Sequence, residues 1–534
     1  MKFILTCLIV SNCCLVWSQK SEVIMPMPKH LVLGTSTFTL NAQATIFTPN
    51  ENLIDQVNYL RQGLFDLKKI NFIQRGSQKA SIILALDKKA ESKNPEAYKL
   101  SIKPQQILIT AQTPNGVFNG IQSLLQLVKA NANNENTKLQ VQEINDEPLY
   151  HWRGLMLDES RHFFGINKIK QLIDWMALYK LNRLHWHLTD EPAWRIEIKK
   201  YPKLTLVGGI GSFTDAFLPA QYYRQDQIKE IVSYAKARFI EVIPEIDMPG
   251  HATAANAAYP EYSGGGSKEH PEFTFNPGKP QTYQYLTDIL KETQLLFPAN
   301  ILHIGGDEVS YGTDKWHTDT AILSLKKQMK LNTDQGVEKY FMRRMADSVF
   351  ALNSKVSAWD EALSADLPVD KTIIFWWRHD KPDQLNQSLD KGYKTVLCPR
   401  LPFYFDFVQD STHRYGRKWD KKYNDILSVY HFDITKLVTN PNSLKNILGI
   451  QANLWTETAQ SEQRLDYLLF PRIAALAERA WSNPRNKNDE DFLDRLKIHL
   501  PWYKKAGLNF YNPFNPPQTS EPVGKSKMIQ NFKD

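Results

Sequence analysis

The sequence of 534 residues is short of cysteine, of basic runs and of long apolar segments, and each shortage excludes a class of protein. Three of its four cysteines, Cys7, Cys13 and Cys14, stand near the N-terminus, and the remaining Cys398 alone excludes a small domain held by disulfides. Glycine and proline make up only about a tenth of the residues, which excludes a collagen-like repeat and a long flexible linker. The net charge of +8 comes without a stripe of Lys and Arg, so we expect no nucleic-acid partner.

The N-terminal segment has the pattern of an export signal. Lys2 precedes an apolar run over residues 3–10 that is too short to cross a bilayer. We therefore expect residues 1–18 to be a signal peptide and the protein to be exported, periplasmic or secreted, in a bacterial envelope. Cys13 raises a lipoprotein as an alternative, although Asn12 stands where a small residue is expected. No other segment is long and apolar enough to span a membrane, so we expect no integral membrane segment.

With 42% apolar residues the chain can bury a large core, and its texture divides it into two regions. Residues 19–147 carry short alternating segments separated by turns, which predicts a small non-catalytic α+β domain. Thr113–Gly116 is predicted to form a turn and Val117–Leu127 a helix. The expected strands are Leu31–Leu40, Ser81–Leu86, Tyr98–Ile102 and Gln106–Ile109.

Residues 148–515 alternate short apolar runs with amphipathic stretches, and this alternation favours a (β/α)8 TIM barrel as the catalytic domain. The interval between the fifth and sixth runs is short, so we expect no full helix there. Residues 516–534 are left as a C-terminal tail. The eight expected strands are Arg153–Leu157, Arg183–Leu188, Glu241–Ile246, Ile301–Gly305, Lys355–Trp359, Thr372–Trp377, Lys394–Leu397 and Gly449–Leu454.

Carboxylates and tryptophans gather at the carboxyl ends of these strands, where a barrel of this kind carries its chemistry. Indole rings stack on the apolar face of a pyranose, and carboxylates and guanidinium groups bind its hydroxyls, so the rim predicts a sugar site. The best pair for glycoside hydrolysis is Asp307 and Glu308, after the fourth strand. Neighbouring residues of a regular strand point to opposite faces, so the two carboxylates can converge only beyond the strand, where Gly305 and Gly306 permit an irregular backbone.

The segments that carry these residues resemble the β-N-acetylhexosaminidases, family 20 of the glycoside hydrolases. His303–Glu308 (HIGGDE) is similar to the family's signature. Five further segments resemble the family pattern in the family's order: Asp158–His162, His185–Asp190 (HWHLTD), Pro244–His251 (PEIDMPGH), Gln451–Glu457 (QANLWTE) and Pro471–Trp481 (PRIAALAERAW). Tyr98–Leu127 resembles the family's non-catalytic N-terminal domain, so the resemblance extends over about residues 25–485.

This resemblance implies an exo-acting, retaining hydrolysis of terminal β-linked GlcNAc or GalNAc, in which the 2-acetamido oxygen attacks its own anomeric carbon and gives an oxazolinium intermediate. Glu308 would be general acid and then general base, and Asp307 would orient the acetamido N–H and stabilise the developing charge. Tyr404 would hydrogen-bond the acetamido oxygen. Asp190 and His251 would assist Glu308, whose pKa must be raised for it to hold a proton near neutral pH.

The resemblance also implies which residues bind the sugar. Walls of the acetamido pocket are expected from Trp359, Trp377 and Trp455, and hydroxyl contacts that close the pocket from Arg161, Asp406 and Glu457. The partner is then an oligosaccharide or glycoconjugate ending in an N-acetylhexosamine, with no cofactor and no metal. The oligomeric state, the natural substrate and the preference between GlcNAc and GalNAc stay open.

Three other functions compete with this one. A metal hydrolase is suggested by His185 and His187, which share one face of a strand, but we find no matching set of further His ligands at other strand ends. A chitinase-like barrel needs an Asp-x-Asp-x-Glu run, which the fourth strand lacks. A non-catalytic carbohydrate-binding protein typically loses its acid, whereas Glu308, Asp307 and Tyr404 are all present here.

Overall fold

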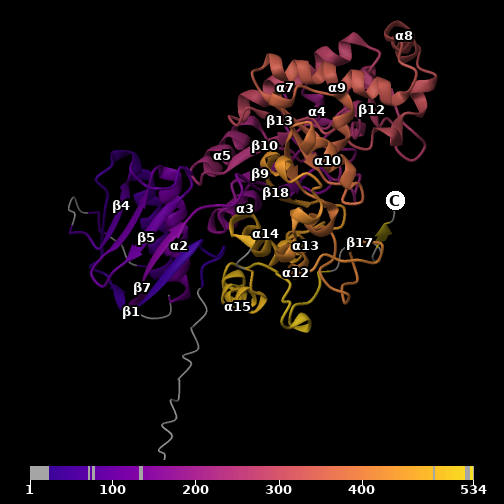
Figure 1. The fold of residues 1–534 in the computed structure, drawn as a ribbon. Coiled ribbons are helices and arrows are strands. Elements are labelled where there is room, and N and C mark those ends of the chain that lie inside the picture. Colours follow the sequence, from indigo (N-terminus) through magenta and orange to yellow (C-terminus); the bar gives the residue numbers. More distant parts are fainter. Residues whose placement is uncertain are drawn as a thin grey trace, which may run out of the picture.

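A computed structural model describes residues 23–69, 73–74, 79–131, 136–484, 487–522 and 530–532. An α+β domain precedes a closed parallel barrel, and the two stand side by side (Figure 1). This confirms the predicted fold class. The predicted signal peptide and the lipoprotein cysteine lie outside the described residues, and Cys398 is a buried free thiol.

The N-terminal domain is built on a seven-stranded sheet of order β1-β7-β5-β6-β4-β2-β3. All four strands expected here are present, and strand pairings add three more. The strands are β1 (His30–Leu40), β2 (Thr45–Phe47), β3 (Ile73–Gln74), β4 (Ile82–Leu86), β5 (Tyr98–Ile102), β6 (Ile107–Ala111) and β7 (Thr137–Asp146). Two helices cover one face of the sheet, α1 (Ile54–Lys68) and α2 (Pro114–Ala130).

Helix α2 begins earlier than the sequence predicts, because residues expected to form a turn form its first turn instead. The Thr113 hydroxyl accepts the N–H of Gly116 at 3.2 Å, and Pro114 occupies the position where a missing N–H costs nothing. The helix is buried along nearly its whole length, from Gly116 to Val128. One side packs on the sheet and the other on the barrel, so α2 is the core of the contact between the domains (Figure 1).

The barrel has eight parallel strands and closes by the pairing of its last strand with its first. The strands are β8 (Trp152–Asp158), β9 (Arg183–His187), β10 (Glu241–Glu245), β13 (Ile301–His303), β14 (Lys355–Trp359), β15 (Thr372–Trp376), β16 (Lys394–Leu397) and β18 (Ile447–Leu454). Their residues are almost all buried, because side chains fill the barrel on one face and helices cover the other. The eight predicted strands are therefore those of the barrel.

Helices surround the barrel (Figure 1). They are α3 (Ile166–Leu178), α4 (Lys203–Leu206), α5 (Gln225–Lys236), α6 (Thr253–Ala258), α7 (Pro280–Leu296), α8 (Thr320–Met329), α9 (Asp334–Ala351), α10 (Pro382–Asp390), α11 (Arg400–Phe403), α12 (Ile426–His431), α13 (Glu462–Leu469), α14 (Arg472–Trp481) and α15 (Asp489–Lys505). Between β14 and β15 the chain forms only 3-10 turns, as the short interval in the sequence predicts. Among the described residues, no helix has the length and apolar character needed to cross a bilayer.

Buried polar contacts join the two domains. Glu96 of the N-terminal domain forms a two-pronged ion pair with Arg153 of β8. Asp146, at the end of β7, accepts the indole N–H of Trp481 at 2.9 Å and faces the ammonium of Lys180 at 3.7 Å. These groups are withdrawn from water, so separating the domains would leave buried charges without their partners.

Candidate active site

A cavity of about 500 Å³ opens at the carboxyl ends of the barrel strands. Its walls include nine of the predicted site residues: Arg161, Asp190, His251, Asp307, Glu308, Trp377, Tyr404, Trp455 and Glu457. Two others, Trp359 and Asp406, are fully buried behind the wall and do not line the cavity. The barrel therefore brings together residues from seven of its strand ends around one hollow.

The acidic pair follows β13 on an irregular backbone. Gly305 and Gly306 have φ of 61° and 92°, and Glu308 itself has φ of 53°, all in the left-handed region. A Cβ at Gly305 would lie 1.7 Å from a carboxylate oxygen of Asp247, so only glycine fits there. This turn lets Asp307 and Glu308 share one hollow although they are neighbours in sequence, as the sequence predicts.

His251 stands between the pair and a second carboxylate. Its Nε2 lies 3.6 Å from an oxygen of Asp307 and 3.6 Å from one of Glu308. Its Nδ1 lies 3.1 Å from Asp190, which also receives the guanidinium of Arg161 at 2.7 Å. Asp190 is thus charged and bonded on two sides, and it fixes both the ring of His251 and the head of Arg161.

The protonation of the acidic pair differs from the prediction. Burial raises the pKa of Asp307 to about 6, although the charge of His251 opposes this. Burial also raises the pKa of Glu308, but the nearby His251 outweighs burial through its contact and its charge, and it leaves the pKa below its ordinary value. The expectation of a raised pKa at Glu308 is therefore wrong for this arrangement, because the positive side chain predicted to assist the acid favours its charged form.

His251 supplies that positive charge. Burial lowers its pKa, but the charges of Asp190 and Asp307 outweigh burial and hold the pKa well above its ordinary value. The imidazolium therefore stands between the charged Asp190 on one side and the acidic pair on the other.

Beneath the pair, Glu245 of β10 collects donors from three other strands. Its carboxylate lies 3.0 Å from Nε2 of His185 and 2.9 Å from Nδ1 of His303, bonds Nδ1 of His187 at 2.6 Å, and accepts the indole N–H of Trp359 at 2.8 Å. The sequence predicts no matching set of further His ligands for the H-x-H pair at other strand ends; the structure brings one histidine, His303, and one carboxylate, Glu245, to it. The nitrogen and oxygen atoms of His185, Glu245 and His303 are close enough together to hold an ion, although each is already bonded to another within the group.

A continuous chain of contacts leads from this cluster to the pair. His187 bonds Glu245 with one ring nitrogen and Asp190 with the other, at 2.9 Å. Burial lowers the pKa of His187, but the charge of Glu245 and the bonds to both carboxylates hold it well above its ordinary value. The positive charge under the site is therefore supplied by His187 and His251, one on each side of Asp190.

Aromatic rings form the opposite wall. The rings of Trp377 and Tyr404 are nearly parallel, with centroids 6.2 Å apart, and Tyr404 lies 6.3 Å from Trp455. The indole N–H of Trp377 donates to Glu361 at 3.0 Å, which fixes the plane of the ring. Trp359 lies behind Trp455, and the centroids of their rings are 6.0 Å apart. Burial raises the pKa of the Tyr404 phenol well above its ordinary value, so the hydroxyl keeps its proton and can donate it.

The far end of the cavity is polar and includes a residue that the sequence analysis missed. Arg417, on β17 (Arg417–Trp419), bonds Glu457 at 2.8 Å and faces Asp406 at 3.7 Å. Burial raises the pKa of Asp406 to about 7 despite that arginine. Arg417 and Trp419 both line the cavity, whereas Asp406 lies behind it. They follow the seventh strand at a distance along the chain, so inspection of strand ends had no signal for them.

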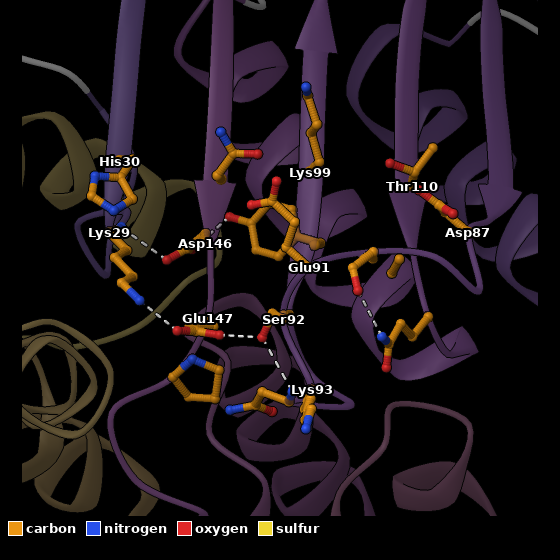
Figure 2. A pocket seen from close by; sticks show the side chains of 18 of the residues that line it. Lys29, His30, Asp87, Glu91, Ser92, Lys93, Lys99, Thr110, Asp146 and Glu147 are labelled. Carbon is orange, nitrogen blue, oxygen red and sulfur yellow. Dashed lines mark hydrogen bonds and ion pairs between the residues drawn. The ribbon is translucent and has the colours of Figure 1, made fainter.

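A larger cavity, of about 1000 Å³, lies in the N-terminal domain between the strand ends and residues 87–94 (Figure 2). Its polar side chains bond one another: Glu147 accepts Lys29 at 2.5 Å and also the hydroxyl of Ser92. The close view shows these groups turned toward each other across the walls. Its described lining holds no converging carboxylate pair with aromatic walls, so the barrel cavity is the candidate site.

Two family models match the chain, one over each domain. Residues 150–484 match the model described as glycosyl hydrolase family 20, catalytic domain, and residues 22–147 match that described as glycosyl hydrolase family 20, domain 2. A beta-hexosaminidase of Porphyromonas gingivalis is 31% identical over 523 residues, which are 95% of this chain and 66% of that protein. A beta-hexosaminidase of Vibrio furnissii is 31% identical over 474 residues, 85% of this chain and 76% of that protein.

Among solved structures, a family 20 exo beta-N-acetylglucosaminidase of Vibrio harveyi, in complex with N-acetylglucosamine, superposes with a TM-score of 0.85. It is 29% identical, and the match covers 93% of this chain and 79% of that one. The chain spans about two thirds of the length of the Porphyromonas protein.

Proposed function

The chain belongs to glycosyl hydrolase family 20, and on that premise we propose that it is an exo-acting, retaining β-N-acetylhexosaminidase. It removes a terminal β-linked N-acetylhexosamine from an oligosaccharide or glycoconjugate, with the substrate's acetamido group as nucleophile. The observation that carries the proposal is the convergence of Asp307, Glu308 and His251 on one small hollow with aromatic walls.

The substrate itself completes the protonation that the mechanism needs. The pKa values place the shared proton on Asp307, whereas general acid catalysis requires it on Glu308. An acetamido N–H placed against Asp307 donates to it and so favours its charged form, while a glycosidic oxygen against Glu308 accepts a proton from it. Binding of the sugar therefore moves the proton between two neighbouring carboxylates.

The acetamido group then attacks the anomeric carbon within one bound molecule. Tyr404 donates to the acetamido oxygen and orients it, and Trp377 and Trp455 enclose the methyl end so that the group cannot rotate away. An oriented intramolecular attack avoids much of the entropy cost of a bimolecular one. Asp307 stabilises the positive charge of the oxazolinium, and Glu308, now ionised, activates the water that opens it with net retention.

The polar end of the cavity supports exo action. Arg161, Glu457 and Arg417 form a closed array of ion pairs beyond the sugar, with Arg161 3.8 Å and Arg417 2.8 Å from the same Glu457 oxygen. Hydroxyls of a terminal sugar find donors and acceptors there, and a further sugar residue on that side would have to displace these ion pairs.

We further propose that the protein is exported, periplasmic or secreted. The support is the pattern of the first eighteen residues, a single positive charge followed by a short apolar run.

Hydrolysis of paired aryl glycosides tests the proposed activity. We expect turnover of aryl N-acetyl-β-glucosaminide and at least about a thousandfold lower turnover of the matching β-glucoside, which lacks the nucleophile. Comparable rates on the two would exclude assisted attack.

Glu308→Gln tests the acid. We expect kcat to fall by about a hundredfold to ten-thousandfold while affinity for N-acetylglucosamine, measured by calorimetry, changes little. The control is Glu490→Gln, an exposed carboxyl on α15 far along the chain from the site. Wild-type protein that binds the sugar but turns over no aryl glycoside would instead support a non-catalytic carbohydrate-binding protein.

A further inference from the structure

Arg417 enters the catalytic cavity from a loop with little secondary structure of its own. The loop runs from Asp406 to the three-residue strand β17, and its last residues, Arg417 and Trp419, both line the cavity. The guanidinium of Arg417 is 22% exposed, whereas the carboxylate of Asp406 behind it is fully buried. A sugar at this end of the cavity therefore meets Arg417 before Asp406.

The C-terminal segment holds this loop. The carboxylate of Glu521 accepts the backbone N–H groups of Arg414 at 2.6 Å and Tyr415 at 3.2 Å. It also receives the guanidinium of Arg464, on α13, at 2.6 Å. Arg464 in turn donates to the carbonyl of Tyr415 at 2.6 Å, so Glu521, Arg464 and the loop backbone form a closed ring of bonds.

Two backbone features connect this ring of bonds to Arg417. Gly416 has φ of 117°, and a Cβ there would lie 2.8 Å from Val408 and 3.1 Å from Arg464, so the chain passes close over the clamped arginine. Strand β19 (Gln530–Phe532), from the same C-terminal segment, pairs in parallel with β17, with Gln530 opposite Arg417. In Figure 1 the yellow strand near the end of the chain lies beside β17. The segment predicted to be a plain tail thus reaches the loop at two places.

We propose that Glu521 is a positioning residue that presents Arg417 to the hydroxyl groups of the terminal sugar, and that Arg417 is a further substrate-binding residue. This rests on the proposed function. The ion pair between Glu521 and Arg464 is largely buried, with side chains 12% and 1% exposed, so removing Glu521 leaves a buried guanidinium without its partner and disturbs the loop more than loss of a surface pair would. Holding the loop in advance means that binding does not have to order it, and the benefit falls on substrate affinity.

A double-mutant cycle on the full chain tests the proposal. We expect Glu521→Ala to raise KM for aryl N-acetyl-β-glucosaminide roughly fivefold with kcat changed less than about twofold. Arg417→Met should raise KM by about tenfold or more. The KM of the double variant should be no higher than that of Arg417→Met, because Glu521 has no guanidinium to position once Arg417 is replaced. Glu521→Gln, which keeps one carbonyl acceptor, should fall between wild type and Glu521→Ala.

The matched control is Glu490→Ala, which removes an exposed carboxyl from α15 and should leave KM unchanged. An unchanged KM in Glu521→Ala, or KM effects that multiply in the double variant, would overturn the proposal while wild-type turnover leaves the proposed function intact. Wild-type protein without activity on the aryl substrate would instead contradict the proposed function.

Limited trypsin digestion tests how firmly Glu521 holds the loop, without a measurement of catalysis. Arg414 is exposed, and its backbone N–H donates to Glu521 in the ring described above. We expect cleavage after Arg414, followed by mass spectrometry, to be about tenfold faster in Glu521→Ala than in wild type, because trypsin cuts locally opened chain. Equal cleavage rates in Glu521→Ala, Glu490→Ala and wild type would show that Glu521 does not hold the loop.

Discussion

Single residues decide the protonation of this site through their charges. His251 is surrounded by carboxylates and stays positive, and that charge lowers the pKa of both members of the acidic pair. Glu308 is the more exposed of the two, at 31% against 11%, so burial raises the pKa of Asp307 more. Below the pKa of about 6 at Asp307 the pair carries one proton, and the side chain that holds it depends on what lies against it.

The pH dependence of kcat/KM follows from this sharing. The proton is lost as the pH rises through the pKa of about 6 at Asp307, so kcat/KM of wild type should fall on the alkaline side of about pH 6. In His251→Gln the positive charge is gone and the pKa of both carboxyls rises, so the alkaline limb should move to higher pH while the maximal rate drops. Rate profiles on an aryl N-acetyl-β-glucosaminide measure both changes.

His431→Gln is the matched control, since His431 is exposed and pairs with Asp489 at the surface. Its profile should overlie that of wild type. An alkaline limb of His251→Gln that stays in place or moves to lower pH would contradict this account of the pair.

At the scale of elements, the turn after β13 is what converts a strand end into a catalytic site. A regular continuation of the strand would send Asp307 and Glu308 to opposite faces. The left-handed backbone at Gly305 and Gly306 bends the chain so that both carboxylates reach His251. Asp247, from the loop after β10, packs against this bend, so two strand ends shape the turn together.

Gly305→Ala tests the turn. The added Cβ meets an oxygen of Asp247 at 1.7 Å and needs a φ of 61°, so the turn must shift and the pair must separate. We expect kcat/KM on the aryl substrate to fall by about a hundredfold or more, since a displacement of about 1 Å has that effect on oriented groups. The control is Gly336→Ala on α9, where the nearest atom lies at 3.4 Å and stability should be kept. Full activity in Gly305→Ala would show that the pair does not depend on this bend.

At the scale of the molecule, the N-terminal domain and the barrel share one buried interface. Arg153, on the first barrel strand, is 1% exposed and holds Glu96 of the other domain, a carbonyl of Lys180 at 2.8 Å and the face of Trp481. Helix α2 fills the space between the two. We infer that the domains unfold together, because neither can leave without exposing these charges.

Arg153→Met should therefore lower the free energy of unfolding by about 3–5 kcal/mol, since it leaves a buried carboxylate without its partner. Urea denaturation followed by fluorescence and by circular dichroism measures this, and wild type should give one transition by both probes. Lys497→Met, which breaks the exposed pair with Asp494, should change stability by less than about 1 kcal/mol. Two separated transitions in wild type would contradict a shared interface.

The sequence by itself determined the fold and most of the site. Eight buried runs at barrel spacing and the alternation in Tyr98–Ile102 report local burial, which a linear sequence expresses directly. The motif HIGGDE placed the acidic pair beyond a strand on a glycine turn, and the structure has it there. Period and local motif are properties of neighbouring residues, so they needed no tertiary information.

Only the tertiary structure decided which distant residues meet. It brought His303 and Glu245 to the H-x-H pair, withdrew Trp359 and Asp406 behind the cavity wall, and placed Arg417 at the front. It also lowered the pKa of Glu308, because a charge's effect depends on distance and burial and not on order along the chain. The contact of Glu521 with Tyr415 joins residues 106 positions apart, and the path of the chain between them is set by packing across the whole barrel.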